Sequence, residues 1–348
     1  MVPERSGAPS SARRSRLPRW AAPTAMAFLL TACIQDAPLD SLDPQGPFAR
    51  RIDDLFWPVF WVATAIFVIV QGLILIAAIF FRDRPGRREP RQIHGNTKLE
   101  VLWTVIPALI LAGVAVPTVQ GVFDLTRCAP GAMPVEVIGH QWWFEYRYPE
   151  SGATTSNIMV IPAGQEVCLT MTSADVLHSF WIPKLNGKRY LVPGQETNLR
   201  LQADEPGIFW GQCGEFCGLS HAIMRARVRA VTPEEFDAWV AAQLEPAPSP
   251  AQGSPAAQGL EVFQAKGCTQ CHTIAGVSEV PADAFNGPDL THFADREVFA
   301  GASFDRTPEN LKSWLANPPE LKPGSYMPDL GLTEAEIDVL IAYLETLR

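Results

Sequence analysis

The sequence has little charge and no excess of positive charge. Asp, Glu, Lys and Arg make up 19% of its 348 residues, and 37 acidic against 28 basic side chains give a formal net charge of −9. A nucleic-acid-binding domain needs a basic face, so this balance argues against nucleic acid as a partner. Scarce charge together with a hydrophobic content of 47% indicates instead that part of the chain lies in a membrane.

The N-terminus has the features of an export signal. Four arginines within residues 13–19 precede an apolar run, Trp20–Leu30, that is too short to cross a bilayer. We therefore expect residues 1–32 to be a signal peptide. The run leads into Leu-Thr-Ala-Cys at Cys33, which resembles the bacterial lipoprotein signal, where cleavage leaves a lipidated cysteine first. The alternative is an ordinary signal peptide that a cysteine happens to follow.

Two long runs, Trp57–Phe81 and Val101–Phe123, contain no charged residue. Each is long enough to cross a bilayer as a helix, so residues 33–123 are expected to form a two-helix transmembrane hairpin. The segment between the runs, residues 82–98, holds six basic and two acidic side chains. The positive-inside rule places it in the cytoplasm, which puts everything from about residue 124 onward on the extracytoplasmic face of a bacterial cell membrane.

Three segments follow the membrane spans. Residues 124–244 alternate apolar and polar side chains in short stretches separated by Pro- and Gly-containing turns, which predicts a β-sandwich or barrel. Residues 245–259 are rich in Pro, Ala and Gln without an apolar period, which is typical of a linker. Residues 260–348 show helical periodicity, as in Glu334–Leu347, where Thr333 and Glu336 form a capping box.

The loop Cys213–Met224 contains two thiols, an imidazole and a thioether. Soft sulfur ligands combined with imidazole suit copper. A mononuclear blue-copper site uses one cysteine and two histidines, whereas two cysteines on one loop can bridge two copper ions. His178, on a different turn, offers the second imidazole. Taken alone, the Cys-x-x-x-Cys spacing also fits a disulfide or half of a zinc site.

Residues Cys268–His272 form a C-x-x-C-H motif, which is typical of c-type haem attachment. The thiols of Cys268 and Cys271 would add to the haem vinyl groups, and His272 would become an iron ligand. Met327, after a proline-rich loop, is the expected sixth ligand, and Met ligation raises the reduction potential. His292 is the competing sixth ligand, and a zinc or redox-active Cys-x-x-Cys is the alternative to the haem.

The loop Cys213–Met224 also resembles the dinuclear copper (CuA) loop of cytochrome c oxidase subunit II. The resemblance implies copper ligation by the side chains of His178, Cys213, Cys217, His221 and Met224 and by the backbone carbonyl of Glu215. It further implies that the Glu215 side chain reaches a magnesium ion at the contact with subunit I.

A second stretch, Gly139–Tyr146, resembles the aromatic strand of the same family. There Trp142 corresponds to the residue through which electrons enter, whereas the alternative is that it packs in the core. Asp175 matches an acidic residue near the copper site, and His140 is expected to be structural. The resemblance covers about residues 50–232.

With the haem motif included, the whole chain resembles subunit II of the caa-type oxidases, which carry a fused cytochrome c domain. The resemblance implies two transmembrane helices, an all-β cupredoxin-like Greek-key barrel and an all-α class I cytochrome c domain. Electrons would pass from cytochrome c through the haem c to CuA and on to the haem of subunit I, where oxygen is reduced to water with proton pumping. Oxidase subunits I and III, cytochrome c and membrane lipid are the implied partners.

Two other functions remain open. A CuA-type nitric oxide reductase would use a similar subunit to accept electrons, and a copper-binding membrane lipoprotein would bind the metal without catalysis. The haem motif and the two spans argue against the lipoprotein. A quinol oxidase subunit II is disfavoured because that relative lacks the copper ligands.

Cys128 and Cys168 belong to none of these motifs. Both are expected outside the cytoplasm, where disulfides persist, so they form either a bridge or two buried free thiols. Residues 233–348 hold 18 acidic and six basic side chains. This charge either serves solubility or forms a surface that steers a basic protein such as cytochrome c.

Overall fold

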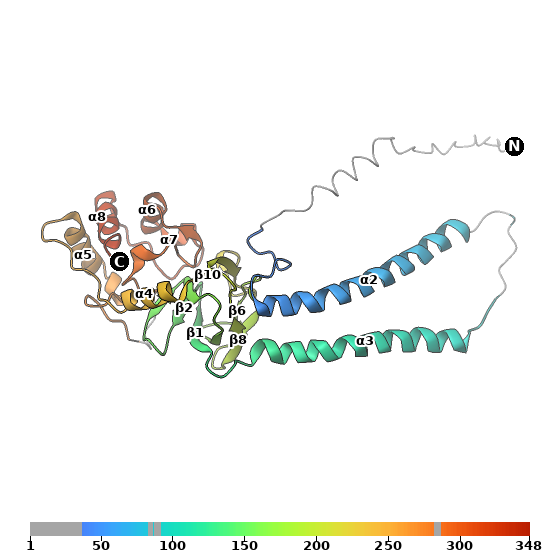
Figure 1. Ribbon diagram of the computed structural model, residues 1–348. Coiled ribbons are helices and arrows are strands. Elements are labelled where there is room, and N and C mark those ends of the chain that lie inside the picture. The colour runs from blue at the N-terminus through green and yellow to red at the C-terminus, as the bar shows by residue number, and fades with distance from the viewer. Residues whose placement is uncertain (1–36, 83–85, 87–91, 282–286) are drawn as a thin grey trace, which may run out of the picture. The chain divides into compact units, whose positions relative to one another are not determined.

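The computed structural model describes residues 37–82, 86, 92–281 and 287–348. The expected signal peptide and the lipidation site at Cys33 lie outside the described residues. Contacts group Leu39–Arg348 into a single unit, which contains all of the helices and strands labelled in Figure 1.

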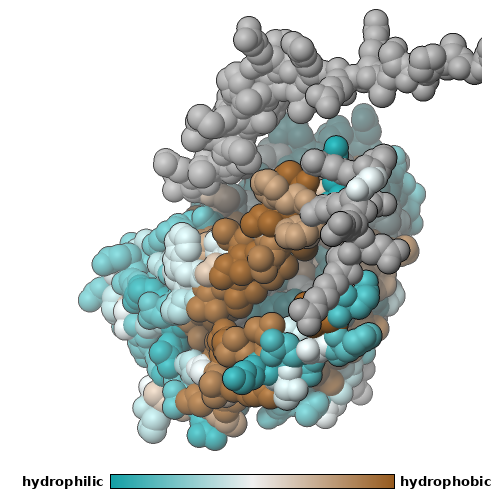
Figure 2. All heavy atoms as spheres, turned by 90° about the vertical axis from the view of Figure 1, so that its right-hand side faces the viewer, coloured by the Kyte–Doolittle hydropathy of each residue, from teal (hydrophilic) through white to brown (hydrophobic). Residues whose placement is uncertain are grey.

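Two long apolar helices come first, α2 (Pro47–Phe80) and α3 (Thr97–Thr126), and both are long and apolar enough to cross a membrane. Helix α3 starts before the uncharged run because the side chain of Asn96 accepts hydrogen bonds from the backbone N–H groups of Lys98 and Leu99. Large apolar side chains such as Trp61 and Leu111 are 62% and 69% exposed. Figure 2 shows hydrophobic side chains gathered on the face where these helices lie, as lipid contact requires.

A β domain follows, with two main sheets and one separate hairpin. The larger sheet has the order β3-β2-β1-β5-β8 and the smaller the order β4-β10-β9, while β6 pairs with β7. The strands are β1 (Met133–His140), β2 (Trp143–Arg147), β3 (Thr154–Ser156), β4 (Ile158–Pro162), β5 (Val167–Ser173), β6 (His178–Phe180), β7 (Arg189–Leu191), β8 (Thr197–Leu201), β9 (Gly207–Gln212) and β10 (Arg225–Val231). This arrangement confirms the expected cupredoxin-like β fold.

Alternation along the strands decides which side chains form the core of the β domain. In β5, every second residue from Val167 to Ser173 is buried, and β1 lies parallel to it with Val137 opposite Met171. The aromatic stretch Gly139–Tyr146 differs from the expected single strand, because it folds into the β1–β2 hairpin with residues 141–142 in the turn.

The C-terminal part is helical, as expected, and its helices lie together beside the strands in Figure 1. The helices are α4 (Pro233–Gln243), α5 (Pro255–Ala265), α6 (Pro308–Ala316), α7 (Pro318–Leu321) and α8 (Glu334–Leu344), with a short hairpin of β11 (Val298–Phe299) and β12 (Phe304–Asp305). Helix α5 begins at Pro255, inside the segment 245–259 that was expected to be a linker. The reason is that Ser254 caps it by accepting from the N–H of Ala257, and Pro255 suits the first helical position.

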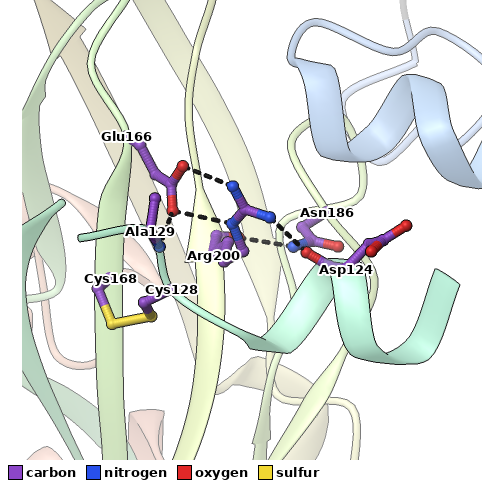
Figure 3. The surroundings of a disulfide bond; sticks show 7 residues. All are labelled: Asp124, Cys128, Ala129, Glu166, Cys168, Asn186 and Arg200. Atoms are coloured by element: carbon purple, nitrogen blue, oxygen red, sulfur yellow. Dashed lines mark hydrogen bonds and ion pairs between the residues drawn. A yellow bond between two sulfur atoms is a disulfide. The ribbon is translucent and has the colours of Figure 1, made fainter. Parts of the chain in front are cut away.

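The end of the second membrane helix is joined to the β domain by covalent and ionic contacts (Figure 3). Cys128 forms a disulfide with Cys168 of β5, so the bridge exists and the two thiols are not free. Arg200 of β8 donates to both carboxylate oxygens of Glu166 at 2.8 and 2.6 Å and to the carbonyl of Asp124 in α3 at 2.6 Å. These hydrogen bonds from Arg200 hold the pKa of Glu166 below its usual range.

Replacing both cysteines, Cys128→Ser with Cys168→Ser, should destabilise the β domain. The bridge closes a loop with a sequence separation of 40 residues, for which chain entropy gives a loss of about 4 kcal/mol in the free energy of unfolding. Denaturant titration of the purified chain followed by circular dichroism measures this loss. An unchanged unfolding midpoint, or wild-type Cys128 and Cys168 peptides that are both alkylated without reduction, would contradict the assignment.

Candidate copper and haem sites

Six sulfur, nitrogen and oxygen atoms meet at one end of the β domain. The Sγ atom of Cys213 lies 3.8 Å from that of Cys217 and 3.9 Å from Nδ1 of His178. The Sγ atom of Cys217 lies 3.6 Å from Nδ1 of His221 and 3.8 Å from Sδ of Met224. The carbonyl oxygen of Glu215 is 3.2 Å from Sγ of Cys213. The structure therefore brings together all six residues that the sequence analysis proposed as copper ligands.

Burial and backbone hydrogen bonds hold this cluster in place. Four of its side chains, those of His178, Cys213, Cys217 and Met224, are at most 3% exposed. The loop is fixed at two points, because the N–H of Cys213 donates to the carbonyl of Met224 and the N–H of Gly214 donates to the carbonyl of Ser179 in β6, both at 2.9 Å. Ligands held on a sheet in this way move little when the charge of a bound metal changes.

The two thiols of the cluster have very different acidities. The hydrogen bond from Cys217 lowers the pKa of Cys213, and the same contact raises the pKa of Cys217. Soft metal ions bind the thiolate form, so metal binding at this pair releases protons.

Asp175 orients the first imidazole. Nε2 of His178 lies 2.8 Å from Oδ1 of Asp175. A carboxylate accepts hydrogen bonds, so Nε2 carries the proton and Nδ1 presents its lone pair to the sulfur cluster. A carboxylate behind a histidine ligand is the usual outer-shell arrangement of metal sites, and it agrees with the expected place of Asp175.

Trp142 lies in the β1–β2 turn directly behind the sulfur cluster. Its indole Nε1–H donates to the carbonyl of Cys217 at 3.0 Å, and the same carbonyl accepts from Nε2 of Gln141 at 2.7 Å. The backbone N–H of Gln141 donates to Oδ2 of Asp175 at 2.6 Å. The turn thus contacts both the Cys213–Met224 loop and the carboxylate that orients His178.

His140 has the structural role expected for it. Its Nε2 lies 2.9 Å from Oε2 of Glu145, and its ring stacks on Trp143 with a centroid distance of 4.2 Å. Burial alone would raise the pKa of Glu145, but hydrogen bonds from His140 and Arg147 outweigh it and hold the pKa below its usual range.

A cavity of about 810 Å³ lies between the helical domain and the β domain, and Trp142 of the β1–β2 turn is among its lining residues. Cys268, Cys271, His272 and Met327 all line it, together with apolar side chains such as Phe293 and Leu340. Nδ1–H of His272 donates to the carbonyl of Pro288 at 2.8 Å, which leaves Nε2 free to bind a metal. Burial lowers the pKa of His272 and so favours this neutral form. Among the described lining residues of this cavity, His292 does not occur.

Arg296 is a further functional candidate in this cavity, and no sequence pattern had indicated it. The side chain is 5% exposed and lines the cavity; its Nη1 donates to Oγ of Ser156 at 2.9 Å, while Nε and Nη2 have no partner among the described residues. Burial lowers the pKa of Arg296 to about 10. A buried guanidinium with two free donors fits an anionic group within the cavity.

The two sites meet at Trp142. The ring of Tyr326, the neighbour of Met327, stacks on the Trp142 indole with a centroid distance of 6.1 Å, and its hydroxyl donates to Oε1 of Gln141 at 2.7 Å. Nζ of Lys322 donates to the carbonyl of Trp142 at 2.6 Å. These pairs are separated by at least 180 residues, so no local sequence pattern could have revealed them.

The fold and the two sites define a membrane-anchored electron-transfer protein with a sulfur-rich metal cluster and a haem cavity. Comparison with known families supports this class of protein for each of three segments of the chain. Residues 39–120 match the transmembrane domain of cytochrome c oxidase subunit II, residues 153–231 its periplasmic domain, and residues 256–348 the cytochrome c family.

Full-length relatives give the family of the whole chain. Cytochrome c oxidase subunit 2 of Alkalihalophilus pseudofirmus is 38% identical over 331 residues, which cover 93% of this chain and 95% of the relative. The protein of the same name from Bacillus sp. (strain PS3) is 35% identical, with 93% and 95% covered. The chain belongs to the cytochrome c oxidase subunit II family and is part of a haem-copper oxidase. Its family domains imply a copper centre, a haem and a periplasmic domain on a membrane anchor.

Other similarities cover less of the chain. Quinol oxidase subunit 2 of Bacillus cereus is 34% identical over 233 residues, which are 65% of this chain and 79% of that protein. The crystal structure of the periplasmic domain of subunit II of cytochrome oxidase of Bradyrhizobium japonicum is 30% identical, with a TM-score of 0.32, and covers 33% of this chain and 96% of that one.

Asp175→Asn should weaken copper binding without removing any ligand. The amide no longer fixes the His178 tautomer, and the loss of such an outer partner typically lowers metal affinity by about 10- to 100-fold. Copper titration against a chelator of known affinity measures the change. Glu166→Gln is the matched control, because it also removes a part-buried carboxylate from the β domain, where its partner is Arg200. Equal affinities in the two variants would contradict the role assigned to Asp175.

Proposed function

We propose that this chain receives electrons from cytochrome c at a covalently bound haem c and passes them to a dinuclear CuA centre and then to the haem of subunit I. One observation carries the proposal. Met327, Tyr326, Trp142 and Cys217 form an unbroken series from the haem cavity to the sulfur cluster, through chain adjacency, ring stacking and a hydrogen bond. Trp142 is therefore the residue through which electrons enter the copper site.

The ligands proposed for copper are the side chains of His178, Cys213, Cys217, His221 and Met224 and the carbonyl of Glu215. Their mutual distances of 3.2 to 3.9 Å support this set, and so does its mixture of soft sulfur and imidazole. The thiolates of Cys213 and Cys217 would hold two copper ions together, and such a centre would supply one-electron transfer with little change in its bond lengths. The chain contributes a buried, rigid loop that keeps those changes small.

The residues of the cavity fit a haem c. Cys268 and Cys271 would form the thioether bonds, and His272 and Met327 would be the axial ligands. The cavity volume, its apolar lining and the free Nε2 of His272 support this assignment, whereas His292 is excluded from the described lining. The unpartnered donors of Arg296 offer a site for a haem propionate, which explains why a guanidinium is buried there.

The remaining proposals concern the assembly. Subunits I and III, cytochrome c and membrane lipid are the proposed partners, at a bacterial cell membrane. Phe216, next to Glu215, is 75% exposed, which supports a contact between the copper loop and subunit I. There the Glu215 side chain would reach a magnesium ion. Oxygen is the proposed acceptor because the full-length relatives carry the name cytochrome c oxidase; nitric oxide reduction by the purified complex would favour the alternative.

Cys217→Ser should abolish the mixed-valence EPR signal of the dinuclear centre, because a hydroxyl cannot replace a bridging thiolate. Met224→Leu should keep both copper ions but shift their reduction potential, since it removes only a weak thioether ligand. EPR spectra with metal analysis of the purified oxidase separate the two outcomes. A normal multi-line signal in the Cys217→Ser protein would contradict the copper assignment.

Met327→Leu should remove the sixth haem ligand and lower the haem reduction potential, because thioether ligation is what raises it. His292→Leu is the matched control and should leave both the absorption spectrum and the potential as in the wild type. Redox titration followed by visible spectroscopy measures both quantities. The ligand assignment fails if the wild-type spectrum and potential are lost in His292→Leu and kept in Met327→Leu.

A further inference from the structure

A second and much smaller cavity, of about 10 Å³, lies where β3, β4 and β10 meet helix α4 and the segment before β11. Ile158, Val160 and Trp239 form its apolar wall. Its polar lining consists of Thr155, Arg229, Gln243, His292, Asp295 and Arg296. A volume of this size holds a single water molecule or a single monatomic ion.

Several nitrogen atoms of this lining have no hydrogen-bond partner. Nε of Arg229, Nε and Nη2 of Arg296 and both ring nitrogens of His292 are buried and lack a partner among the described residues. His292 is 3% exposed and Arg296 is 5% exposed, so bulk water hardly reaches either side chain. Buried polar groups in native proteins almost always have a partner, so these nitrogens indicate a ligand that accepts hydrogen bonds.

Positive charge at this cavity is not balanced. Arg229 and Arg296 each bring a guanidinium group, and neither forms an ion pair with a carboxylate among the described residues. Burial lowers the pKa of Arg296 to about 10, although Asp289 and Asp295 act in the opposite direction. The nearby carboxylates therefore do not offset the cost of burying this charge, whereas buried charges in proteins are normally paired.

The haem cavity does not supply the missing partner. Of the two cavities, Arg296 lines both, whereas Arg229 and His292 line only the small one. A haem propionate at Arg296 would therefore leave the donors of Arg229 and His292 without an acceptor. In either protonation state His292 keeps an N–H to donate, and a guanidinium has donors only. A lining of this kind suits an anion better than water, because the hydrogens of water need acceptors in turn.

We propose that the cavity bounded by Arg229, His292 and Arg296 binds one small inorganic anion of the size and charge of chloride. The anion accepts hydrogen bonds from β10 and from the segment before β11, so it joins two segments that are far apart in the sequence. Its apolar neighbours strengthen these bonds, because a hydrogen bond to a charge is stronger where the local dielectric is low. The inference goes beyond the proposed function, since it involves neither electron transfer nor a ligand of the haem.

Anomalous X-ray scattering from bromide locates the anion directly. Crystals of the purified oxidase are transferred from chloride to bromide, whose absorption edge distinguishes it from water. An anomalous difference peak should lie among the three side chains in the wild type and should be absent from Arg229→Met. Arg225→Met is the matched control and should keep the peak, because Arg225 lies on the same strand with an exposed side chain that does not line the cavity.

Hydrogen–deuterium exchange tests the same site in solution. The purified oxidase is compared in chloride and in gluconate of equal ionic strength, and peptides from residues 225–243 and 287–299 are followed by mass spectrometry. In the wild type and in Arg225→Met, amide exchange should be severalfold slower in chloride, because a ligand that binds only the folded state stabilises it. Arg229→Met and His292→Leu should lose this dependence, since each removes a donor to the anion.

A wild-type crystal without the bromide peak would show that the cavity holds water at most, and would overturn the proposal. Exchange that is equal in chloride and gluconate would overturn it as well, since a peak would then reflect binding at crystal concentration only. The same holds for a chloride effect that persists in Arg229→Met. Neither measurement depends on electron transfer, so a missing copper or haem spectrum would refute the proposed function alone.

Discussion

The hydrogen bonds to the backbone carbonyl of Cys217 are the interactions on which the rest of the structure depends. This oxygen accepts from the Trp142 indole and from the Gln141 amide, so one atom joins the copper loop to the β1–β2 turn. On the other side of that turn, Tyr326 stacks on the indole next to Met327. Electron transfer needs fixed distances between centres, and these contacts fix the two cofactor sites relative to one indole ring.

The same principle applies where the β domain meets the membrane anchor. A domain connected to a helix by flexible chain would lose its orientation relative to partner subunits in the bilayer. Here the disulfide between Cys128 and Cys168 and the hydrogen bonds of Arg200 to Glu166 and Asp124 tie the end of α3 to the sheet (Figure 3). Covalent and ionic ties of this kind restrict the movement of the β domain relative to the end of α3.

Sequence patterns predicted the membrane helices, the β domain and the helical domain, because these depend on local periodicity. The six residues that meet at the sulfur cluster were inferred from the Cys213–Met224 loop together with the family resemblance, since His178 is 35 residues from Cys213. The features that these patterns did not predict also have physical reasons. The aromatic stretch at Gly139–Tyr146 is a hairpin, since apolar content alone does not reveal a turn. Lys322 and Arg296 carried no signal, because their partners belong to a different domain and are remote in sequence. Contacts between domains can be predicted only once the fold is known, whereas the spacing of the cysteines can be recognised in the sequence.

The central claim is that the two cofactor sites form one docked relay within the chain. The most direct test is the rate of electron transfer from haem to copper after photochemical reduction of the haem, measured in the purified oxidase at increasing ionic strength. Buried contacts are screened little by salt, so the rate should be first-order and should not change with ionic strength or protein concentration. A rate that falls steeply with added salt would show that the helical domain docks only transiently, and would contradict the central claim.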